Sequence, residues 1–295
     1  MRRGADGSAG APGGGEDLRN SVYDGAFAQV YATLTGGVFL TGFALHLGLG
    51  EVLIGLLAAV PFLVTVLQLP ASYHVVRTGR RKQVCLSAAR ASRLLWVPIL
   101  LLAILPLGAE AAGVLLLLLL VCSHSLGTVS YVSWLSWTTD LVPDGVRGRF
   151  FGTRNMLCGA AGMVAALFFG NLVDAAGSLG PWGVSLGYAS AFGAGVAAGL
   201  LGLRFLERIS EPAPVPGPRL ESIAHALLLP MRDAAFRPYL LFGCLWGFSV
   251  QFASPFFNVY LLRDLGYGLG FVAGLGVLST LADLLGMHVW GAISD

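Results

Sequence analysis

Polar side chains are scarce inside the long apolar segments of this sequence, and Asp283 is the acid that we place well inside one of them. A carboxylate in such surroundings is costly and usually faces a cavity or a polar partner. Asp283 is therefore a candidate for binding a solute or a coupling proton. The alternative is a packing residue that is protonated or hydrogen-bonded to its neighbours.

The apolar segment at about 112–138 carries imidazole, hydroxyl and phenol groups at helical spacing. His124, Thr128 and Tyr131 are separated by four and three residues, so a helix places them on one face. They could offer hydrogen bonds to a solute, and Tyr131 could also stack on it. A histidine inside such a segment can instead be a packing donor, and this alternative stays open.

Amide and phenol groups occur in two further apolar segments. Gln251 and Asn258 are seven residues apart and share a helix face, while Gln29 and Tyr31 lie in the first segment. We expect these residues to line a cavity. Polar side chains in such segments also bridge neighbouring helices, which is the alternative.

A basic cluster follows the second apolar segment and contains Arg77, Gly79, Arg80 and Arg81. Gly79 permits a tight turn, because glycine tolerates a positive φ. The arginines can bind lipid phosphates and the carbonyl ends of helices. Their alternative role is plain anchoring at the cytoplasmic face of a membrane.

A second charged loop contains Asp140, Arg147, Gly148 and Arg149. Asp140 could pair with Arg147 or Arg149, and such a pair could open and close as the helices move. The alternative is an exposed ion pair, which is typically worth less than ~1 kcal/mol.

Several other kinds of chemistry lack their sequence patterns. The sequence contains no Gly-x-x-x-x-Gly-Lys-Ser/Thr phosphate loop, no His-Glu-x-x-His zinc motif and no Cys-x-x-Cys pair among its 4 cysteines. We expect no cofactor, no metal site and no nucleic-acid partner. An integral-membrane enzyme is accordingly the least favoured class.

The elements that must position these residues are long and apolar. Mean hydropathy is +0.75, and 12% of residues are charged, against about a quarter in soluble domains. Blocks long enough to cross a bilayer, roughly 20 residues each, occur at about 26–47, 51–75, 85–107, 112–138, 153–174, 182–205, 238–261 and 268–291. Backbone polar groups in lipid must pair within their own segment. The sequence therefore predicts an all-α polytopic membrane protein with eight transmembrane helices.

The distribution of the 18 lysines and arginines predicts the orientation. With the N-terminus in the cytoplasm, eight helices place all of them inside except Arg263. This bias follows the positive-inside rule. It also supports the helix count, because one missed helix would scramble the pattern.

The chain divides into four predicted parts. Residues 1–21 form a disordered cytoplasmic tail, 22–206 a six-helix half, 207–236 a central cytoplasmic linker, and 237–295 the first two helices of a second half. Shifting the numbering by 219 brings Ser72 onto Gly291 and Val76 onto Asp295. This indicates an internal repeat, which is typical of transporter folds with a substrate site between the repeats.

These features together resemble the major facilitator superfamily of secondary transporters. Its signature loop runs Gly-x-x-x-Asp-Arg-x-Gly-Arg-Arg/Lys. The residues that match it here are Arg77, Gly79, Arg80 and Arg81. Ser72 replaces the first Gly and Val76 replaces the Asp, while Gly291 and Asp295 match the second copy.

The loop from Asp140 to Asn155 is similar to one found in many bacterial members, so the resemblance covers about 22–295. It implies a permease that moves a small solute by alternating access. The implied location is a bacterial-type inner membrane, with both termini in the cytoplasm. The expected partners are the lipid bilayer, an unknown small solute and a coupling proton or ion. In the family the basic loop latches a cytoplasmic gate through its acidic residue, a role that Val76 cannot fill and that would fall to Asp295.

Members of this family have twelve helices in two six-helix halves. Six helices plus two therefore imply a chain that is truncated at its C-terminal side, either naturally or as a sequence fragment. The alternative function is a non-transporting remnant or membrane scaffold. The resemblance does not name the substrate or the direction of transport.

Overall fold

The computed structural model of the chain describes residues 14–105, 107–142, 144–212 and 231–294. Every regular element within those ranges is a helix, and seven helical segments are long and apolar enough to cross a membrane. A shorter apolar stretch, Leu269–Asp283, accounts for the eighth predicted segment. The all-helical fold class is therefore confirmed.

The first half contains α1 (Gly15–Leu34), α2 (Gly37–His46), α3 (Glu51–Leu63), α4 (Gln68–Thr78), α5 (Arg81–Leu94), α6 (Trp96–Leu102), α7 (Ala109–Leu141), α8 (Arg147–Gly177) and α9 (Pro181–Arg208). Three spans are each made of two helices in series: α1 with α2, α3 with α4, and α5 with α6. The second half begins with α11 (Arg237–Val259), which continues into a π-helical turn at Tyr260–Asp264, and ends with α12 (Leu269–Ser294).

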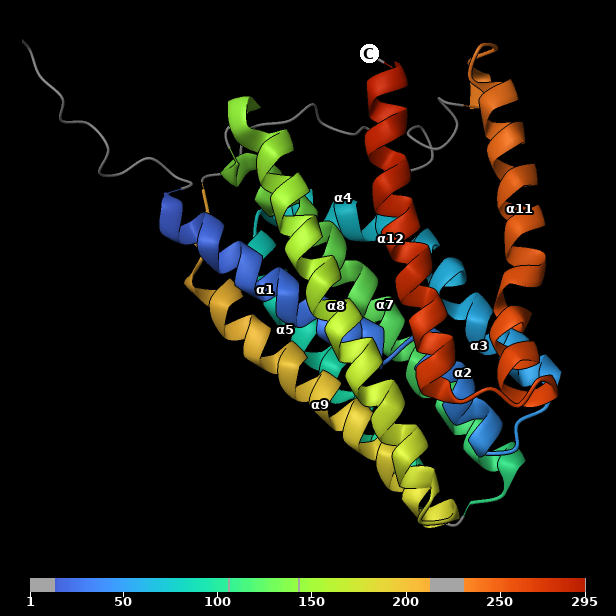
Figure 1. Cartoon of the computed structure of the whole chain (residues 1–295). Helices are drawn as coiled ribbons and strands as arrows, with labels where there is room; N and C mark the ends of the chain where they lie inside the picture. Colours follow the sequence, from blue (N-terminus) through green and yellow to red (C-terminus); the bar gives the residue numbers. More distant parts are fainter. Residues whose placement is uncertain (1–13, 106, 143, 213–230, 295) are drawn as a thin grey trace, which may run out of the picture.

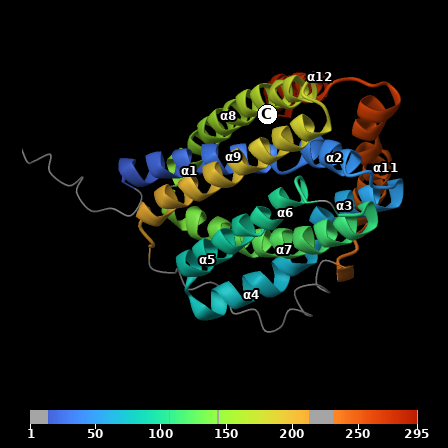
Figure 2. The ribbon, with the colours of Figure 1, turned by 90° about the horizontal axis from the view of Figure 1, so that it is seen from below.

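The helices of the first half form one bundle, in which α1 packs against α8 and α9 while α5 packs against α7. Figures 1 and 2 show α12 beside α8 near the start of α12, and in Figure 1 the two helices diverge toward the end of α12. In Figure 1 α11 stands apart from the first half along most of its length, and its end lies near α2 and α3, beside which Figure 2 also shows it. The two halves therefore meet at one end of the molecule and separate at the other.

Glycines on α9 allow it to approach α1 closely. A Cβ atom at Gly195 would lie 3.2 Å from the Cβ of Leu34, and one at Gly202 would lie 2.9 Å from the Cβ of Phe27. Small residues at such spacing let helix backbones pack tightly in lipid, where burial of apolar surface drives no association. This contact fixes the helix that carries Gln29 and Tyr31.

An aromatic cluster fills the centre of the first half. The ring of Phe192 lies 5.3 Å from that of Trp96 and 5.0 Å from that of Phe43, both edge-on, and all three side chains are buried. Edge-to-face aromatic pairs contribute about 0.5–1.5 kcal/mol beyond their buried area. The cluster ties α2, α6 and α9 together.

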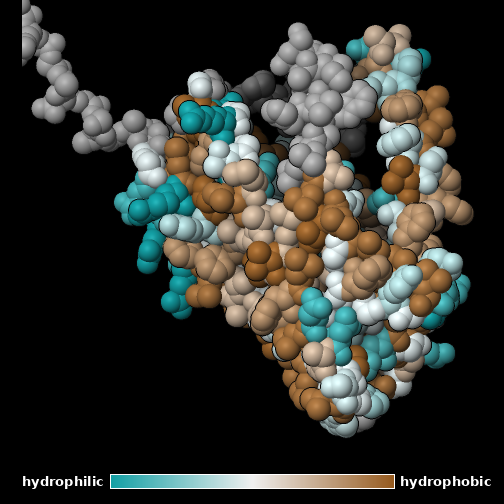
Figure 3. Space-filling model, in the orientation of Figure 1, coloured by the Kyte–Doolittle hydropathy of each residue, from teal (hydrophilic) through white to brown (hydrophobic). Residues whose placement is uncertain are grey.

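The outer surface has the character of a membrane protein. Figure 3 shows apolar side chains over the faces of α8, α11 and α12, while hydrophilic ones gather where α1 begins and α9 ends. Large apolar residues are exposed along the spans, among them Val164, Phe168 and Leu186. Such an apolar surface is stable in contact with lipid, whereas its exposure to water is unfavourable.

The predicted start of the first helix, and with it the extent of the N-terminal tail, is wrong. The structure begins α1 at Gly15, so residues 15–21 are helical, and Asp24 lies within the span. Glu16 and Asp17 occupy the first turn, where the helix dipole favours acidic side chains. Residues 213–230 of the predicted linker, together with Asp295, lie outside the described residues.

Candidate functional site

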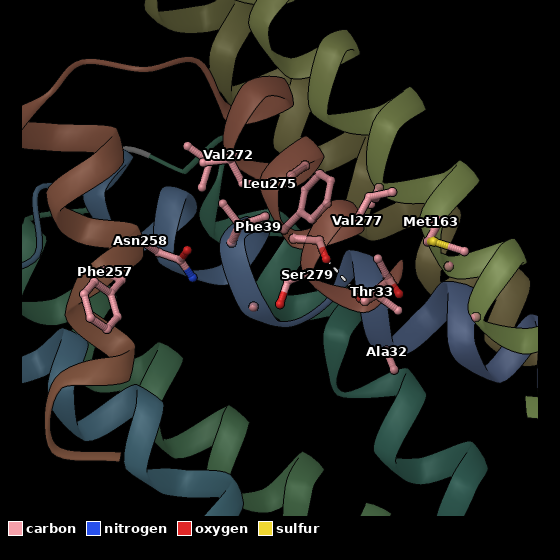
Figure 4. Close-up of a pocket in the computed structure, with 18 of the residues that line it drawn as sticks. Ala32, Thr33, Phe39, Met163, Phe257, Asn258, Val272, Leu275, Val277 and Ser279 are labelled. Carbon is pink, nitrogen blue, oxygen red and sulfur yellow. Dashed lines mark hydrogen bonds between the residues drawn. The ribbon is translucent and has the colours of Figure 1, made fainter. Parts of the chain in front are cut away.

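A cavity of about 670 Å³ lies between the two halves and is here called the interface cavity. Gln29 and Thr33 on α1 line one side, and Ser254 and Asn258 on α11 and Thr280 on α12 line the other. The amide of Gln29 donates to the Thr33 hydroxyl at 3.4 Å. Figure 4 shows Asn258 and Thr33 on opposite sides of this space, with Ser279 between them.

A second cavity of about 320 Å³ adjoins the first and shares Gly37, Ser254 and Asn258 with it. His124 on α7 and Gln251 on α11 also line it. We call it the α7–α11 cavity. The predicted helix face of Gln251 and Asn258 is therefore a cavity wall.

A third space, of about 600 Å³, shares Gln29, Gly159 and Thr280 with the interface cavity. Its lining includes Tyr31 and Tyr131 among the predicted residues. It also contains Arg93 and Arg154, so we call it the arginine cavity.

Three charged residues, Asp24, Arg93 and Arg154, line the arginine cavity at the end of the bundle where α1 begins. Asp24 is 4% exposed, and its Oδ1 atom has no hydrogen-bond partner among the described residues. Arg93 Nη1 donates to the carbonyl oxygen of Gly199, and Arg154 Nε donates to that of Ser21 at 3.1 Å. Each guanidinium also lies near an aromatic ring: the Cζ of Arg93 is 5.7 Å from the ring centroid of Tyr31, and the Cζ of Arg154 is 4.7 Å from that of Trp134. Charged groups at membrane depth mark functional sites more often than packing sites.

Two predicted site residues lie away from these spaces. Thr128 is half-buried on α7 and lines none of the three cavities, although Gly127, Ser130 and Tyr131 line the arginine cavity. Asp283 is exposed on α12, one turn beyond Thr280, and lines none of the three. Helical periodicity shows which residues share a face of a helix. It does not show whether a neighbouring helix, a cavity or lipid lies against that face.

The basic loop forms the turn that its glycine predicts. Gly79 ends α4 with φ = 66° in the left-handed region. Arg77 and Arg80 are exposed, whereas Arg81 is 5% exposed. The three predicted bases therefore differ in role, and Arg81 is the one held by the protein.

Arg81 joins the two charged loops. Its Nη1 atom lies 2.5 Å from Asp140 Oδ2 and also donates to the carbonyl oxygen of Ser136 at 3.0 Å. Arg147 Nη2 donates to the carbonyl oxygens of Thr139 and Val142, at 2.8 and 3.2 Å. Asp140 therefore pairs with Arg81. The sequence analysis expected Arg147 or Arg149 as its partner and did not consider Arg81.

The remaining described gating candidates are Gly148, Arg149 and Gly291, and all three lie in helices. Gly148 and Arg149 are exposed in the first turn of α8. Gly291 lies in the last turns of α12.

At the opposite end of the molecule, α8 holds the start of α12. The carboxylate of Asp174 accepts hydrogen bonds from the backbone N–H groups of Leu269 and Gly270, at 2.7 and 2.8 Å. A Cβ atom at Gly170 would lie 2.9 Å from the Cα of Gly270, so the two backbones touch. Arg263 Nη2 lies 3.1 Å from Glu51 Oε1 in an exposed ion pair between the halves.

Comparison with known protein families decides the identity. The family model described as Major Facilitator Superfamily matches residues 25–295, which is most of the chain. The chain belongs to the major facilitator superfamily. Comparisons with curated proteins and with solved structures returned no match.

Membership in the major facilitator superfamily makes the chain a multi-pass membrane protein and a transmembrane transporter in the general sense. It also points away from an enzyme. The partners that follow at this level are the lipid bilayer and a small solute. The cavities between the halves accordingly become the candidate solute site.

Sequence reasoning missed the three charges of the arginine cavity. The predicted first helix starts two residues after Asp24, and the charge pattern places Arg93 among the cytoplasmic bases. The available signal was the acidic first turn at Glu16 and Asp17, which moves the helix start upstream.

Proposed function

We propose that this superfamily member is a secondary active transporter that moves a small solute by alternating access. The observation that carries the proposal is the interface cavity, whose polar lining residues come from α1 in the first half and α11 and α12 in the second. A solute held there touches both halves at once. Movement of one half against the other then changes the side from which the solute is reached.

The shape supports a state that is closed at one end. Asp174 and the α8–α12 contact join the halves at the end where α12 begins, and the helices diverge toward the end where α1 begins. We propose that this open end faces the cytoplasm of a bacterial-type inner membrane, with the N-terminus and the predicted end of α12 on that side. The positive-inside rule supports this orientation, because Arg77, Arg80 and Arg149 are all exposed there.

Within this proposal, Gln29, Gln251 and Asn258 bind the solute through their amides. Asp283, which is exposed on α12, stays a candidate for a coupling proton or ion. The cytoplasmic latch combines Arg81 of the signature loop with Asp140 at the end of α7.

Asn258→Ala tests the site, because Asn258 lines both the interface cavity and the α7–α11 cavity. We expect solute uptake into proteoliposomes at subsaturating concentration to fall about tenfold, since a lost hydrogen bond of about 1.4 kcal/mol corresponds to that factor. The matched control is Ser249→Ala, an exposed residue on the same helix whose hydroxyl donates to the carbonyl of Leu245 in its own helix.

The assay uses protein expressed from its complete reading frame and a labelled panel of sugars, amino acids, organic acids and cationic drugs. Equal uptake by Asn258→Ala and Ser249→Ala would remove the interface cavity from the mechanism. A folded protein that moves no member of the panel would favour the membrane scaffold instead.

A further inference from the structure

The arginine cavity holds more positive than negative charge. Arg93 and Arg154 are its two cationic lining residues, and Asp24 is its one carboxylate, among the described residues. Arginine keeps its charge in proteins under all ordinary conditions. The cavity therefore carries an excess of at least one positive charge, whatever the protonation state of Asp24.

Among the described residues, no carboxylate forms an ion pair with either guanidinium. Within the described part of the chain, neither Arg93 nor Arg154 has a carboxylate oxygen within 4.0 Å. Two other arginines near this end of the bundle are paired, Arg81 with Asp140 and Arg90 with Glu207. Arg93 is buried and Arg154 is half-buried. Buried charges are normally paired, so surplus cations at this site indicate a partner from outside the chain.

Both guanidiniums sit in places that glycines keep open. A Cβ atom at Gly25 would lie 2.5 Å from Arg154 Nη2, and one at Gly199 would lie 3.0 Å from Arg93 Cδ. Any larger residue at these two positions would push the arginine side chains away. The glycines therefore place each arginine against the wall of the cavity.

The contacts hold each guanidinium but leave donors free. The one hydrogen bond of Arg93 and the one of Arg154 within the described residues both go to backbone carbonyls, of Gly199 and Ser21. The nearby rings of Tyr31 and Trp134 restrict how the two planes can turn. A guanidinium presents five N–H donors in a fork that matches two oxygens of a carboxylate or phosphate.

We propose that the arginine cavity binds the carboxylate or phosphate group of a small anionic solute, through Arg93 and Arg154. This inference rests on the proposed transport function and names the class of its substrate. The remainder of the solute extends into the interface cavity, which shares Gln29, Gly159 and Thr280 with this site. Asp24 sits in the same wall and repels the bound anion when it is ionised.

Thermal unfolding of the purified protein in neutral detergent tests the class of solute. The probes are inorganic phosphate and three matched pairs: glucuronate with glucose, glucose 6-phosphate with glucose, and succinate with succinamide. We expect at least one anion to raise the unfolding temperature while its neutral counterpart does not. No shift with any anion, or an equal shift with the neutral counterpart, would overturn the proposal.

Variants then assign the effect to the site. Arg154→Gln should weaken binding of the stabilising anion about tenfold or more, because a hydrogen bond to a charged group is worth about 1.5–3 kcal/mol. Arg204→Gln, an exposed arginine on α9, is the matched control and should bind normally. Asp24→Asn should bind more tightly, since it removes the one competing carboxylate. Equal losses in Arg154→Gln and Arg204→Gln would contradict the assignment.

A lipid headgroup could supply the same phosphate chemistry, and nanodiscs containing phosphatidylglycerol or phosphatidylcholine distinguish it from a soluble solute. We expect the two lipids to stabilise the protein equally. If only the anionic lipid stabilises the protein, and this effect depends on Arg154, the ligand is a lipid headgroup and the proposal of a soluble solute is wrong.

Transport assays separate the failure of the anion site from the failure of the transport function. If a neutral or cationic solute is transported equally well by wild type and Arg154→Gln, the transport function stands and the anion site falls. If no solute is transported across the membrane at all, both the transport function and the anion site proposed for its substrate are wrong.

Discussion

At the scale of single residues, Arg81 shows how a shared motif becomes a specific contact. The motif contains three arginines, and only Arg81 is buried. It bonds Asp140, the carbonyl of Ser136 and, at 3.1 Å, the carbonyl of Pro212 after α9. One guanidinium therefore ties the end of α7 and the segment after α9 to the start of α5. Neighbouring arginines of equal charge remain free to meet lipid phosphates.

Arg81→Gln should destabilise the first half, because it leaves Asp140 and two carbonyl groups without their donor. Asp140 is exposed, and Ser136 and Pro212 are half-buried, so each lost hydrogen bond costs about 0.5–1.5 kcal/mol. We expect a lower unfolding temperature in detergent, measured by intrinsic fluorescence. Arg80→Gln, one residue earlier and exposed, is the control, and an equal effect in both variants would show that general charge matters instead.

At the scale of helices, the contact between α8 and α12 is the main joint between the halves. Gly170 and Gly270 let the two backbones touch, and Asp174 satisfies the N–H groups of Leu269 and Gly270 at the start of α12. A carboxylate at a helix N-terminus also interacts favourably with the helix dipole. This joint closes the end of the molecule opposite the arginine cavity.

Asp174→Ala should loosen that joint and shift the population toward states open at this end. Spin labels at Leu179 and Tyr267, both exposed, report the distance across it in a background without the native cysteines. We expect a longer-distance population to grow by double electron–electron resonance. Ser178→Ala is the control, because the Ser178 hydroxyl donates to the carbonyl of Ala175 in the same turn. An unchanged distribution in Asp174→Ala would show that the glycine contact alone holds the joint.

At the scale of the whole molecule, charge and hydropathy work together to orient the bundle. Exposed arginines such as Arg77, Arg80 and Arg149 lie at the end where α1 begins, and Arg263 lies at the other end. Seven long apolar segments run between these two ends. The cavities lie along the same axis, with the arginine cavity at the arginine-rich end and the interface cavity beside it.

Cysteine labelling checks that orientation. In a background without native cysteines, Leu179→Cys should react with a membrane-impermeant maleimide in intact spheroplasts, because the proposed orientation places the exposed α8–α9 turn outside. Arg80→Cys should react only after permeabilisation. The reverse pattern would invert the proposed topology and place the arginine cavity toward the outside.

Much of this architecture is determined locally in the sequence. The eight apolar segments, their helical state, the positive φ at Gly79 and the family all follow from hydropathy, charge and short motifs, and the structure and the family comparison confirm them. These properties depend on how a segment transfers into lipid and on single backbone positions. Neither depends on which helix becomes the neighbour.

The tertiary structure decided which of these residues meet. Tyr31 and Tyr131 line a cavity with Arg93 and Arg154, whereas Asp283 lines none of the three cavities described. Asp24 belongs to that cavity because α1 extends to Gly15, and Asp140 meets Arg81 across 59 residues of chain. Such contacts between distant residues depend on helix packing angles and on glycines that let particular backbones touch. Helical periodicity gives the face of each helix, but only packing decides what covers it.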